Sequence, residues 1–399
     1  MPSGPTTSLD LTDPGFVADP YPRLAAELSA APVAWSESAG MWLVFGHAEC
    51  SAALRHRGLQ RIWTDREPAA ALEPFNLLHR NQMMENPPPV HTRLRRPVAE
   101  AFNRGHVERL RPVVRELAAY LLGRVSSGEE FDVIAEYAEP LPVLVIARLL
   151  GVEEDHVDDL RGWSQAIVAM YEPAPGPDTV DAAVRASTEF AALVDDLIAR
   201  RRRTPAADLI SDLVATDLSD DEVIATVVLL LNAGHEASVN VFGNGLRPLL
   251  DLGRPGLLFG GEVDAATAVE EMLRWDSALQ MFVRTAVGDL ELAGVPVAAG
   301  EQVALLLGSA NRDPGAFAAP TAFDPTRDPN PHLAFSAGVH FCLGAPLARM
   351  ELTESLTALL EGFGSLKVVD AESRGTFVLR GHRRLVVSAS PDARGDDLV

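Results

Sequence analysis

The most chemically distinctive segment covers residues 335–344 and reads FSAGVHFCLG, directly before a helical pattern. Pro346 falls in the first turn predicted for that helix, where a missing N–H is tolerated. Cys342 therefore lies at a helix N-terminus, where unpaired N–H groups and the helix dipole lower the pKa of a thiol. Such a sulfur is a metal ligand or a nucleophile. Gly338 and Gly344 on either side would let the backbone approach something flat and bulky.

Other groups of polar residues have spacings that suit chemistry, although each also has an ordinary explanation. Glu271 and Arg274 share one face of a predicted helix, as in a surface ion pair. His91 and Arg95 suit a paired anion such as a carboxylate, or form part of a solvated basic face. The other cysteine, Cys50, is interpreted as a small buried hydrophobic side chain.

A glycine, a histidine and an acid interrupt a strongly apolar helical segment at Gly234, His235 and Glu236. Residues that disfavour a buried helix but occur in the middle of one tend to mark functional positions. His235 alone is interpreted as a packing or hydrogen-bonded residue, so Glu236 is the more informative of the three.

One long helix is predicted to begin after Ser219 and to end before Pro248. Ser219 and Glu222 have capping-box spacing, and the nearly continuous apolar run from Val223 to Ala233 indicates burial on all sides. Helical periodicity also covers 107–125, 138–150, 155–171, 178–203 and 265–275, the last capped by Asp264. Short hairpins are predicted over 284–298 and a long coil over 311–344. The fold class is therefore mainly α with a minor β part.

Composition excludes several classes of protein. The 399 residues carry a net charge of −22, so a protein that coats nucleic acid is excluded. The N-terminus lacks the features of a secretory signal, no apolar run approaches the length of a membrane span, and two cysteines form no disulfide framework. We therefore expect a globular cytoplasmic protein with no membrane partner.

Together, in this order and spacing, the motifs resemble the cytochrome P450 family, the haem-thiolate monooxygenases, and in particular its soluble bacterial members. The resemblance runs from about Asp13 to Arg384. It implies a single P450 domain over residues 1–399, with about 12 flexible residues at each end and the long helix crossing the haem.

The resemblance also implies the cofactor, haem b with Cys342 as the thiolate ligand of its iron. A cysteinate pushes electron density onto the iron and favours O–O cleavage. Two buried propionates need cationic or donor groups, because an unpaired buried charge is very costly. The implied propionate contacts are His91, Arg95, Arg284 and His340, and the other implied haem contacts are Ala233, Phe335, Gly338 and Gly344.

Two further sets of residues follow from the resemblance. Glu271 and Arg274 match the pair with which the family holds the cysteine-loop scaffold, with Arg327 as the third member. The stretches that line the substrate pocket contain Met83, Met84, Asn232, Ala233, Leu279 and Phe282. The segment 172–178, EPAPGPD, would lie in a lid over that pocket, or is a plain surface turn.

The positions expected to deliver protons, Glu236, Ala237 and Ser238, depart from the family pattern of an acid followed by threonine. A helix turns by about 100° per residue, so the Ser238 hydroxyl should not point where that threonine would. A substrate hydroxyl or an ordered water network would complete the relay with Glu236. Alternatively, the enzyme performs radical coupling or desaturation without oxygen insertion. A second departure, Ala278 in place of a proline, affects loop rigidity.

Electrons must also reach the haem, and the resemblance implies a small acidic ferredoxin, served by an NAD(P)H-fed ferredoxin reductase. Seven arginines and two glutamates between His91 and Arg115 give a local charge of +5, which could steer such a partner. The same arginines could instead serve the propionates or internal ion pairs.

The function that the sequence favours is hydroxylation or epoxidation of a mid-sized organic substrate by a haem-thiolate monooxygenase, in bacterial specialised metabolism. The first alternative is oxidative coupling or desaturation by the same haem. An alternative from another class is a non-catalytic haem-binding sensor, which has no evident need for a buried acid such as Glu236 or for a lid.

Overall fold

The structure is a computed structural model that describes residues 4–125, 130–253, 263–363 and 365–390. The longer helices are α2 (Tyr21–Ala30), α3 (His47–Arg55), α4 (Glu73–Arg80), α5 (Val90–Ala99), α6 (Arg104–Leu122), α7 (Pro140–Leu150), α8 (Val157–Val168), α9 (Pro177–Arg203), α11 (Asp220–Asp251), α13 (Ala265–Trp275) and α15 (Ala345–Gly362). The shorter ones are α1 (Pro14–Ala18), α10 (Leu209–Val214), α14 (Leu307–Ala310), η1 (Met83–Glu85), η2 (Ile134–Ala138), η3 (Glu154–His156), η4 (Ala169–Tyr171) and η5 (Gly338–His340).

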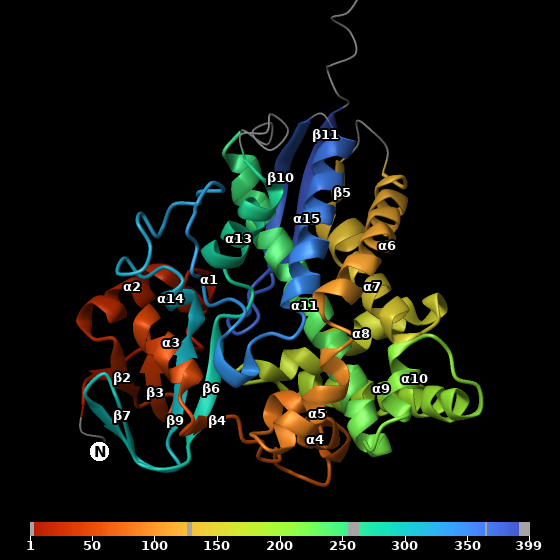
Figure 1. The fold of residues 1–399 in the computed structure, drawn as a ribbon. Coiled ribbons are helices and arrows are strands. Elements are labelled where there is room, and N and C mark those ends of the chain that lie inside the picture. Colours follow the sequence, from red (N-terminus) through yellow and green to blue (C-terminus); the bar gives the residue numbers. More distant parts are fainter. Residues whose placement is uncertain (1–3, 126–129, 254–262, 364, 391–399) are drawn as a thin grey trace, which may run out of the picture.

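The strands form three small sheets, so the expectation of a mainly α protein with a minor β part is confirmed. The largest sheet has the order β1-β2-β3-β9-β6-β4, followed by a β10-β11-β5 sheet and a β7-β8 hairpin. Their bounds are β1 (Thr6–Thr7), β2 (Val33–Ser36), β3 (Met41–Val44), β4 (Leu59–Gln60), β5 (Glu130–Asp132), β6 (Met281–Ala286), β7 (Leu290–Leu292), β8 (Val295–Val297), β9 (Gln302–Leu306), β10 (Ser365–Ser373) and β11 (His382–Ser390). Figure 1 shows the six-stranded sheet on one side and most helices on the other.

Helix α11 runs through the helical part of the molecule (Figure 1). The predicted capping box is present, because Ser219 Oγ accepts from the Glu222 N–H and the Glu222 carboxylate accepts from the Ser219 N–H. The predicted end before Pro248 is wrong: the helix continues to Asp251, and burial of Leu249 and Leu250 holds its last turn against the core. Losing one backbone bond so close to the C-terminus is tolerated.

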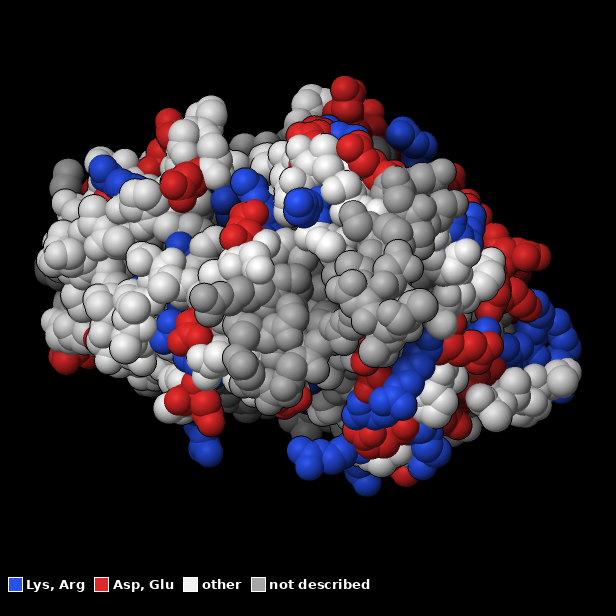
Figure 2. Space-filling view, turned by 90° about the horizontal axis from the view of Figure 1, so that it is seen from above, with Lys and Arg blue, Asp and Glu red and all other residues white. Residues whose placement is uncertain are grey.

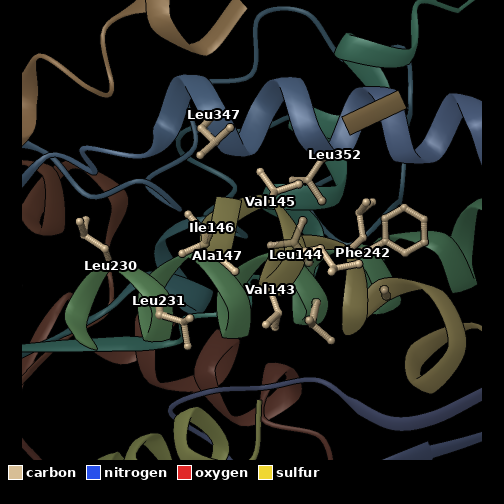
Figure 3. Close-up of a cluster of buried hydrophobic side chains, with 14 of the residues drawn as sticks. Val143, Leu144, Val145, Ile146, Ala147, Leu230, Leu231, Phe242, Leu347 and Leu352 are labelled. Carbon is tan, nitrogen blue, oxygen red and sulfur yellow. The ribbon is translucent and has the colours of Figure 1, made fainter. Parts of the chain in front are cut away.

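The core around α11 is built by helices on several sides of it. Val143, Leu144, Val145, Ile146 and Ala147 of α7 are all buried, as a helix packed on more than one face requires. Figure 3 shows their side chains gathered with those of α11 and α15 in one apolar cluster. This packing fixes α11 and the start of α15 relative to each other, which is what a site shared by the two helices requires.

Among the described residues, α11 is the one helix whose length and composition would allow it to cross a membrane. Most of that stretch, 72%, is buried inside the protein, as is usual for a core helix. On the face in Figure 2, acidic and basic side chains of the described residues are interspersed.

The chain near the N-terminus is packed, in contrast to the expected flexibility of about 12 residues. From Gly4 onward it is described: β1 pairs with β2, and Leu9 and Leu11 are buried against the N-terminal core. Two apolar anchors and a strand pairing hold this segment in place. Residues 1–3, and residues 391–399 at the other end, lie outside the described residues.

Candidate active site

Cys342 lies immediately before α15, as the sequence predicts. Its backbone N–H donates to the Phe335 carbonyl at 2.9 Å, which closes the loop that carries it. Burial raises the pKa of the Cys342 thiol, while the N–H groups of Gly344 and Ala345, together with Arg95 and Arg349, act to lower it. The expected pKa-lowering groups are therefore present, but burial outweighs them in the protein alone. Any stronger preference for the thiolate must come from a bound cation.

The two glycines of the cysteine loop have different roles. Gly338 has a φ of +70°, and a Cβ there would lie 2.5 Å from the Leu54 carbonyl oxygen of α3. Its lack of a side chain therefore serves the turn and the close packing on α3, and the expectation that it also lets the backbone approach a flat group stays a prediction. A Cβ on Gly344 would meet open space, so this position is compatible with such an approach.

A buried cluster of cationic and imidazole groups lies beside the cysteine loop. The rings of His91 and His340 are 4.4 Å apart, and Nε2 of His91 is buried with no hydrogen-bond partner in the described structure. Arg284 is 2% exposed, and the one hydrogen bond of its guanidinium among the described residues goes to the Val283 carbonyl. Burial lowers the pKa of Arg284 to about 9, helped by the nearby Arg61.

The sequence did not reveal Arg61 or its partner Glu85. The Arg61 guanidinium forms an ion pair with the buried Glu85 carboxylate. Burial lowers the pKa of His340, and Arg284, His91, Arg61 and Arg95 lower it further. Several positive groups thus lie in one region with a single acid, Glu85. Bound anions would balance the excess of positive charge in this region.

One face of α11 is left partly uncovered in the middle of the helix. Ala233 is exposed in the middle of the helix although its neighbours Leu231 and Asn232 are buried, and Ala237 on the same face is half-buried. Gly234 has a separate reason: a Cβ there would lie 2.9 Å from Ile146 of α7. The small residues therefore let α7 pack closely on one side and leave space on the other.

Glu236 is almost fully buried and forms an ion pair with Arg374, whose NH1 donates to Oε2 at 2.7 Å. Its Oε1 has no hydrogen-bond partner within the described part of the chain, and His235 Nδ1 lies 3.5 Å from it. Burial raises the pKa of Glu236, and Arg374 acts to lower it. His235 is a buried residue, as expected: its Nδ1 lies 3.3 Å from Ser164 Oγ, and burial lowers its pKa to about 3, so it is neutral.

Ser238 is buried near the Glu351 carboxyl of α15, and its hydroxyl acts to lower the pKa of that carboxyl. Burial has the larger effect and raises the pKa of Glu351 to about 8. Ser238 thus lies toward α15, in agreement with the helical geometry. Glu351 is therefore mainly protonated at neutral pH.

The unusual Glu351 gives a testable pH dependence of stability. Between its ordinary pKa of 4.5 and the folded value of about 8, the native state holds a proton that the unfolded chain has released. Stability therefore falls as pH rises through this window, by up to about 1.4 kcal/mol per pH unit. We expect Glu351→Gln to raise Tm more at about pH 7.5 than at about pH 5. An equal effect at both pH values would contradict this assignment.

Glu271, Arg274 and Arg327 lie together, as the resemblance implies. Two nitrogens of Arg274 donate to the Glu271 carboxylate at 2.7 Å each, and Arg327 Nε donates to it at 3.1 Å. Arg274 also donates to the carbonyls of Asn311, Pro320 and Ala322. The cluster thus ties α13 to the coil that leads into the cysteine loop.

Another set of contacts from α13, this one to α15, was not predicted. Arg349, seven residues after the cysteine, donates to the Glu270 carboxylate at 2.6 and 2.9 Å. His332 Nε2 lies 3.0 Å from the same carboxylate, and these contacts lower the pKa of Glu270 to about 2 despite its burial. The guanidinium of Arg349 also lies over the Phe335 ring. The neighbouring Glu270 and Glu271 therefore hold both ends of the cysteine loop.

The residues predicted to line a substrate pocket come from several segments. Met83 and Asn232 are buried, and Met84 and Leu279 are half-buried. The side-chain Oδ1 of Asn232 has no hydrogen-bond partner among the described residues. Phe282 is contacted by the guanidinium groups of Arg61 and Arg284. It therefore lies next to the cationic cluster.

The loop 374–381 between β10 and β11 packs against Leu279, one of these predicted residues, and no signal in the sequence indicated this contact. Leu379 forms an isolated bridge with Leu279, and Gln280 N–H donates to the Val378 carbonyl. Its tip is held by Glu172, whose carboxylate accepts the N–H groups of Phe377, Val378 and Leu379. The first residue of the 172–178 segment is therefore an anchor, while most of the rest is exposed.

The arginines between 91 and 115 divide into two groups. Arg93 pairs with Glu222, Arg111 and Arg115 with Glu354, and Arg95 NH2 donates to the Phe341 carbonyl at 2.7 Å. Arg96, Arg104 and Arg109 are exposed and form no ion pair within the described residues. Val339 and Phe341 of the cysteine loop are exposed apolar side chains. Internal pairs thus account for part of the local charge and leave some of it at the surface.

Comparisons with known proteins decide the family. A family model for cytochrome P450 matches residues 265–378, and the chain is 35% identical to 6-deoxyerythronolide B hydroxylase of Saccharopolyspora erythraea, covering 96% of this chain and 99% of the relative. The chain is a cytochrome P450. It is an oxidoreductase of the monooxygenase type, and its curated relatives include hydroxylases and monooxygenases of bacterial secondary metabolism.

Solved P450 structures have the same fold. P450BioI in complex with an acyl carrier protein carrying hexadec-9Z-enoic acid is 32% identical with a TM-score of 0.90, covering 94% of this chain and 100% of that one. CxnD, a P450 for C–S bond formation in chuangxinmycin biosynthesis, is 28% identical with a TM-score of 0.86, covering 96% of each chain.

The residues of this P450 fit the haem-thiolate cofactor of its family. Two propionates would provide the anions that the buried Arg284 and the unpartnered His91 Nε2 lack. The open face at Ala233 and Ala237 suits a flat group close to α11, and the sulfur of Cys342 lies where four groups favour its anionic form.

Proposed function

We propose that this P450 is a haem-thiolate monooxygenase that hydroxylates or epoxidises a mid-sized organic substrate in bacterial specialised metabolism. The observation that carries the proposal is the buried set of positive groups beside the cysteine loop, in which Glu85 pairs with Arg61 and no carboxylate of the described residues is hydrogen-bonded to Arg284. A metal-free hydrolytic or structural role gives no reason to bury Arg284 without a carboxylate bonded to it.

Haem held by the Cys342 thiolate would supply the redox chemistry that activates dioxygen. Arg284, His91 and His340 would bind the propionates, and Arg95 would fix the loop through the Phe341 carbonyl while adding positive charge near the sulfur. The scaffold around Glu271 and Glu270 would keep the loop rigid, so that the sulfur stays in place during turnover.

Glu236 would supply protons from the α11 side, without the help of a neighbouring hydroxyl. Ala237 has none, and Ser238 lies near Glu351 of α15. A hydroxyl of the substrate, or ordered water in the space beside Ala237, would then complete the route. The Asn232 amide, with its unpartnered oxygen, would hold a donor group of the substrate.

The electron donor would be a small acidic ferredoxin fed by an NAD(P)H-dependent reductase, in the cytoplasm. Arg96, Arg104 and Arg109 are free to attract acidic groups, and Val339 and Phe341 provide an exposed apolar contact. One domain covering residues 1–399 would contain all of these parts.

Spectroscopy and product mass test the proposal on the wild-type protein. Ferrous protein treated with carbon monoxide should show the strongly red-displaced absorption of a thiolate-ligated haem. Candidate substrates are then selected by spin-state change and turned over with ferredoxin, reductase and NADPH under isotopically labelled dioxygen. Product that carries one labelled oxygen supports monooxygenation, whereas haem binding with no consumption of oxygen or ligand indicates a sensor.

Oxidative coupling or desaturation is the second candidate function. The absence of a hydroxyl at Ala237 favours it, and the similarity to CxnD, named for C–S bond formation, supports it. In the same experiment, a product that has lost two hydrogens and gained no labelled oxygen would replace the first proposal with this one.

A further inference from the structure

Arg66, in the loop before α4, carries a half-buried guanidinium that pairs with no acid among the described residues. It lies over the Phe75 ring, 5.4 Å from the ring centroid, and burial lowers its pKa. Glu85, the one carboxylate that acts on this pKa from a distance, is already bound to Arg61. A cation that is removed from water without a partner is costly, so the site favours an anion that the protein does not supply.

The acids next to Arg66 in the sequence are engaged elsewhere. Asp65 forms an ion pair with Arg80 of α4 and also accepts the indole N–H of Trp63. The Glu67 carboxylate accepts a backbone N–H two residues further along the chain. Neither acid is within ion-pair distance of Arg66 in the described structure, so its charge is not used in the local network.

The backbone at Arg66 is held in place by the side chain of Asn76. Asn76 Oδ1 accepts the Arg66 N–H at 2.9 Å, and Asn76 Nδ2 donates to the Arg66 carbonyl at 3.0 Å. Asn76 is fully buried in α4, one residue after Phe75. One amide thus fixes the position from which the guanidinium extends. A cation that is positioned in advance loses less conformational entropy when it binds a ligand.

A stack of rings connects this guanidinium with the predicted substrate pocket. Phe75 stacks on His79, and His79 stacks on Trp63. The Trp63 backbone N–H donates to the Glu85 carbonyl of η1, the helix that contains both predicted pocket methionines. Burial lowers the pKa of His79 to about 4, so His79 is neutral and the positive charge of the stack belongs to Arg66. This charge therefore borders the predicted pocket through η1.

We propose that Arg66 binds a carboxylate of the substrate, and that this P450 acts on organic acids. A guanidinium that lies over an aromatic ring keeps its in-plane N–H groups available for both oxygens of a carboxylate. The rest of the substrate would lie along η1 and α11, which carry most of the predicted pocket residues. This inference rests on the proposed function, because it names the class of substrate for the same site.

Matched acids and amides test the inference on the ferric holoenzyme. The probes are dodecanoic acid, hexadecanoic acid and naproxen, each with its primary amide, and their affinities are measured by spin-state change and by calorimetry at about pH 7.5, where the acids are ionised. We expect the acids to bind the wild type about 10- to 100-fold more tightly than their amides, the range for a hydrogen-bonded charge. In Arg66→Met the acids should lose this advantage, whereas the amides should bind as before.

Three further variants separate recognition of a carboxylate from a general loss of positive charge. Arg66→Lys keeps the charge but not the planar fork, and should keep part of the preference for acids. Arg66→Gln has no charge and should lose the preference, which makes it the second test if Arg66→Met does not retain haem. Arg80→Met is the matched control, because Arg80 lies in the same region but already pairs with Asp65 and Glu73. It should leave the ratio of acid to amide affinity unchanged.

The inference is overturned if no acid binds the wild type more tightly than its amide. It is also overturned if loss of the Arg66 charge weakens acid and amide equally, or if Arg80→Met removes the preference to the same extent. The carbon monoxide spectrum is recorded for every protein. A normal thiolate spectrum without a preference for acids rejects the role of Arg66 alone, whereas absence of that spectrum in the wild type rejects the proposed function.

Discussion

Replacing Cys342 with serine is expected to remove the red-displaced carbon monoxide band completely. A serine hydroxyl cannot supply the electron density of a thiolate, and its much higher pKa keeps it neutral in a buried position. The N–H groups of Gly344 and Ala345 favour an anion at this position, but they cannot ionise an alcohol. Substrate oxidation in the presence of ferredoxin, reductase and NADPH should fall to background.

Cys50→Ser is the matched control for this substitution. The Cys50 thiol is fully buried in α3 and donates to the Val44 carbonyl at 3.3 Å, and burial raises its pKa well above the usual range. Cys50→Ser should leave the band in place, since a hydroxyl can make the same bond. A Cys342→Ser protein that keeps the band, or a Cys50→Ser protein that loses it with haem still bound, would contradict the assignment of the ligand.

Arg274→Met should destabilise the protein by about 3–5 kcal/mol, the range for breaking a buried ion pair from one side. Both Arg274 and Glu271 are fully buried, and the guanidinium satisfies a carboxylate and the carbonyls of Asn311, Pro320 and Ala322. Methionine preserves much of the volume but removes every one of these bonds. Since the lost carbonyl partners lie in the coil before the cysteine loop, weaker haem retention should accompany the lower stability.

Urea unfolding and the fraction of protein that retains haem after gel filtration measure this effect. Arg23→Met is the control, because Arg23 forms an exposed helical pair with Glu27 that is worth about 0.5 kcal/mol or less. A free energy of unfolding for Arg274→Met within about 1 kcal/mol of the wild-type value would show that the cluster does not stabilise the scaffold as described.

Local signals in the sequence predicted a large part of the fold. The Ser219 capping box marks the start of α11, and Pro346 and Gly344 mark the start of α15, because such caps depend on a few neighbouring residues. Pro248 misled the prediction of the end of α11, because packing of the following leucines overrides a proline near a helix terminus.

The site was predicted less completely, because several of its contacts join distant segments. Arg374 meets Glu236 across 138 positions, and Glu172 meets Leu379 across 207. No periodicity or spacing encodes which surface arginine reaches a buried acid, since the packing of α7, α8 and β10 around α11 decides it. Glu270 was likewise overlooked beside Glu271, although both acids are used.

The anchoring of the 374–381 loop by Glu172 has a consequence for any exchange of this loop. Three N–H groups at the loop tip depend on a carboxylate at the end of the α8 region, and each donor left unsatisfied in a buried site costs about 1–3 kcal/mol. A loop grafted from a relative with a different backbone path will be held only if the segment that follows η4 is grafted with it. The two stretches therefore form a single exchangeable unit for redesign.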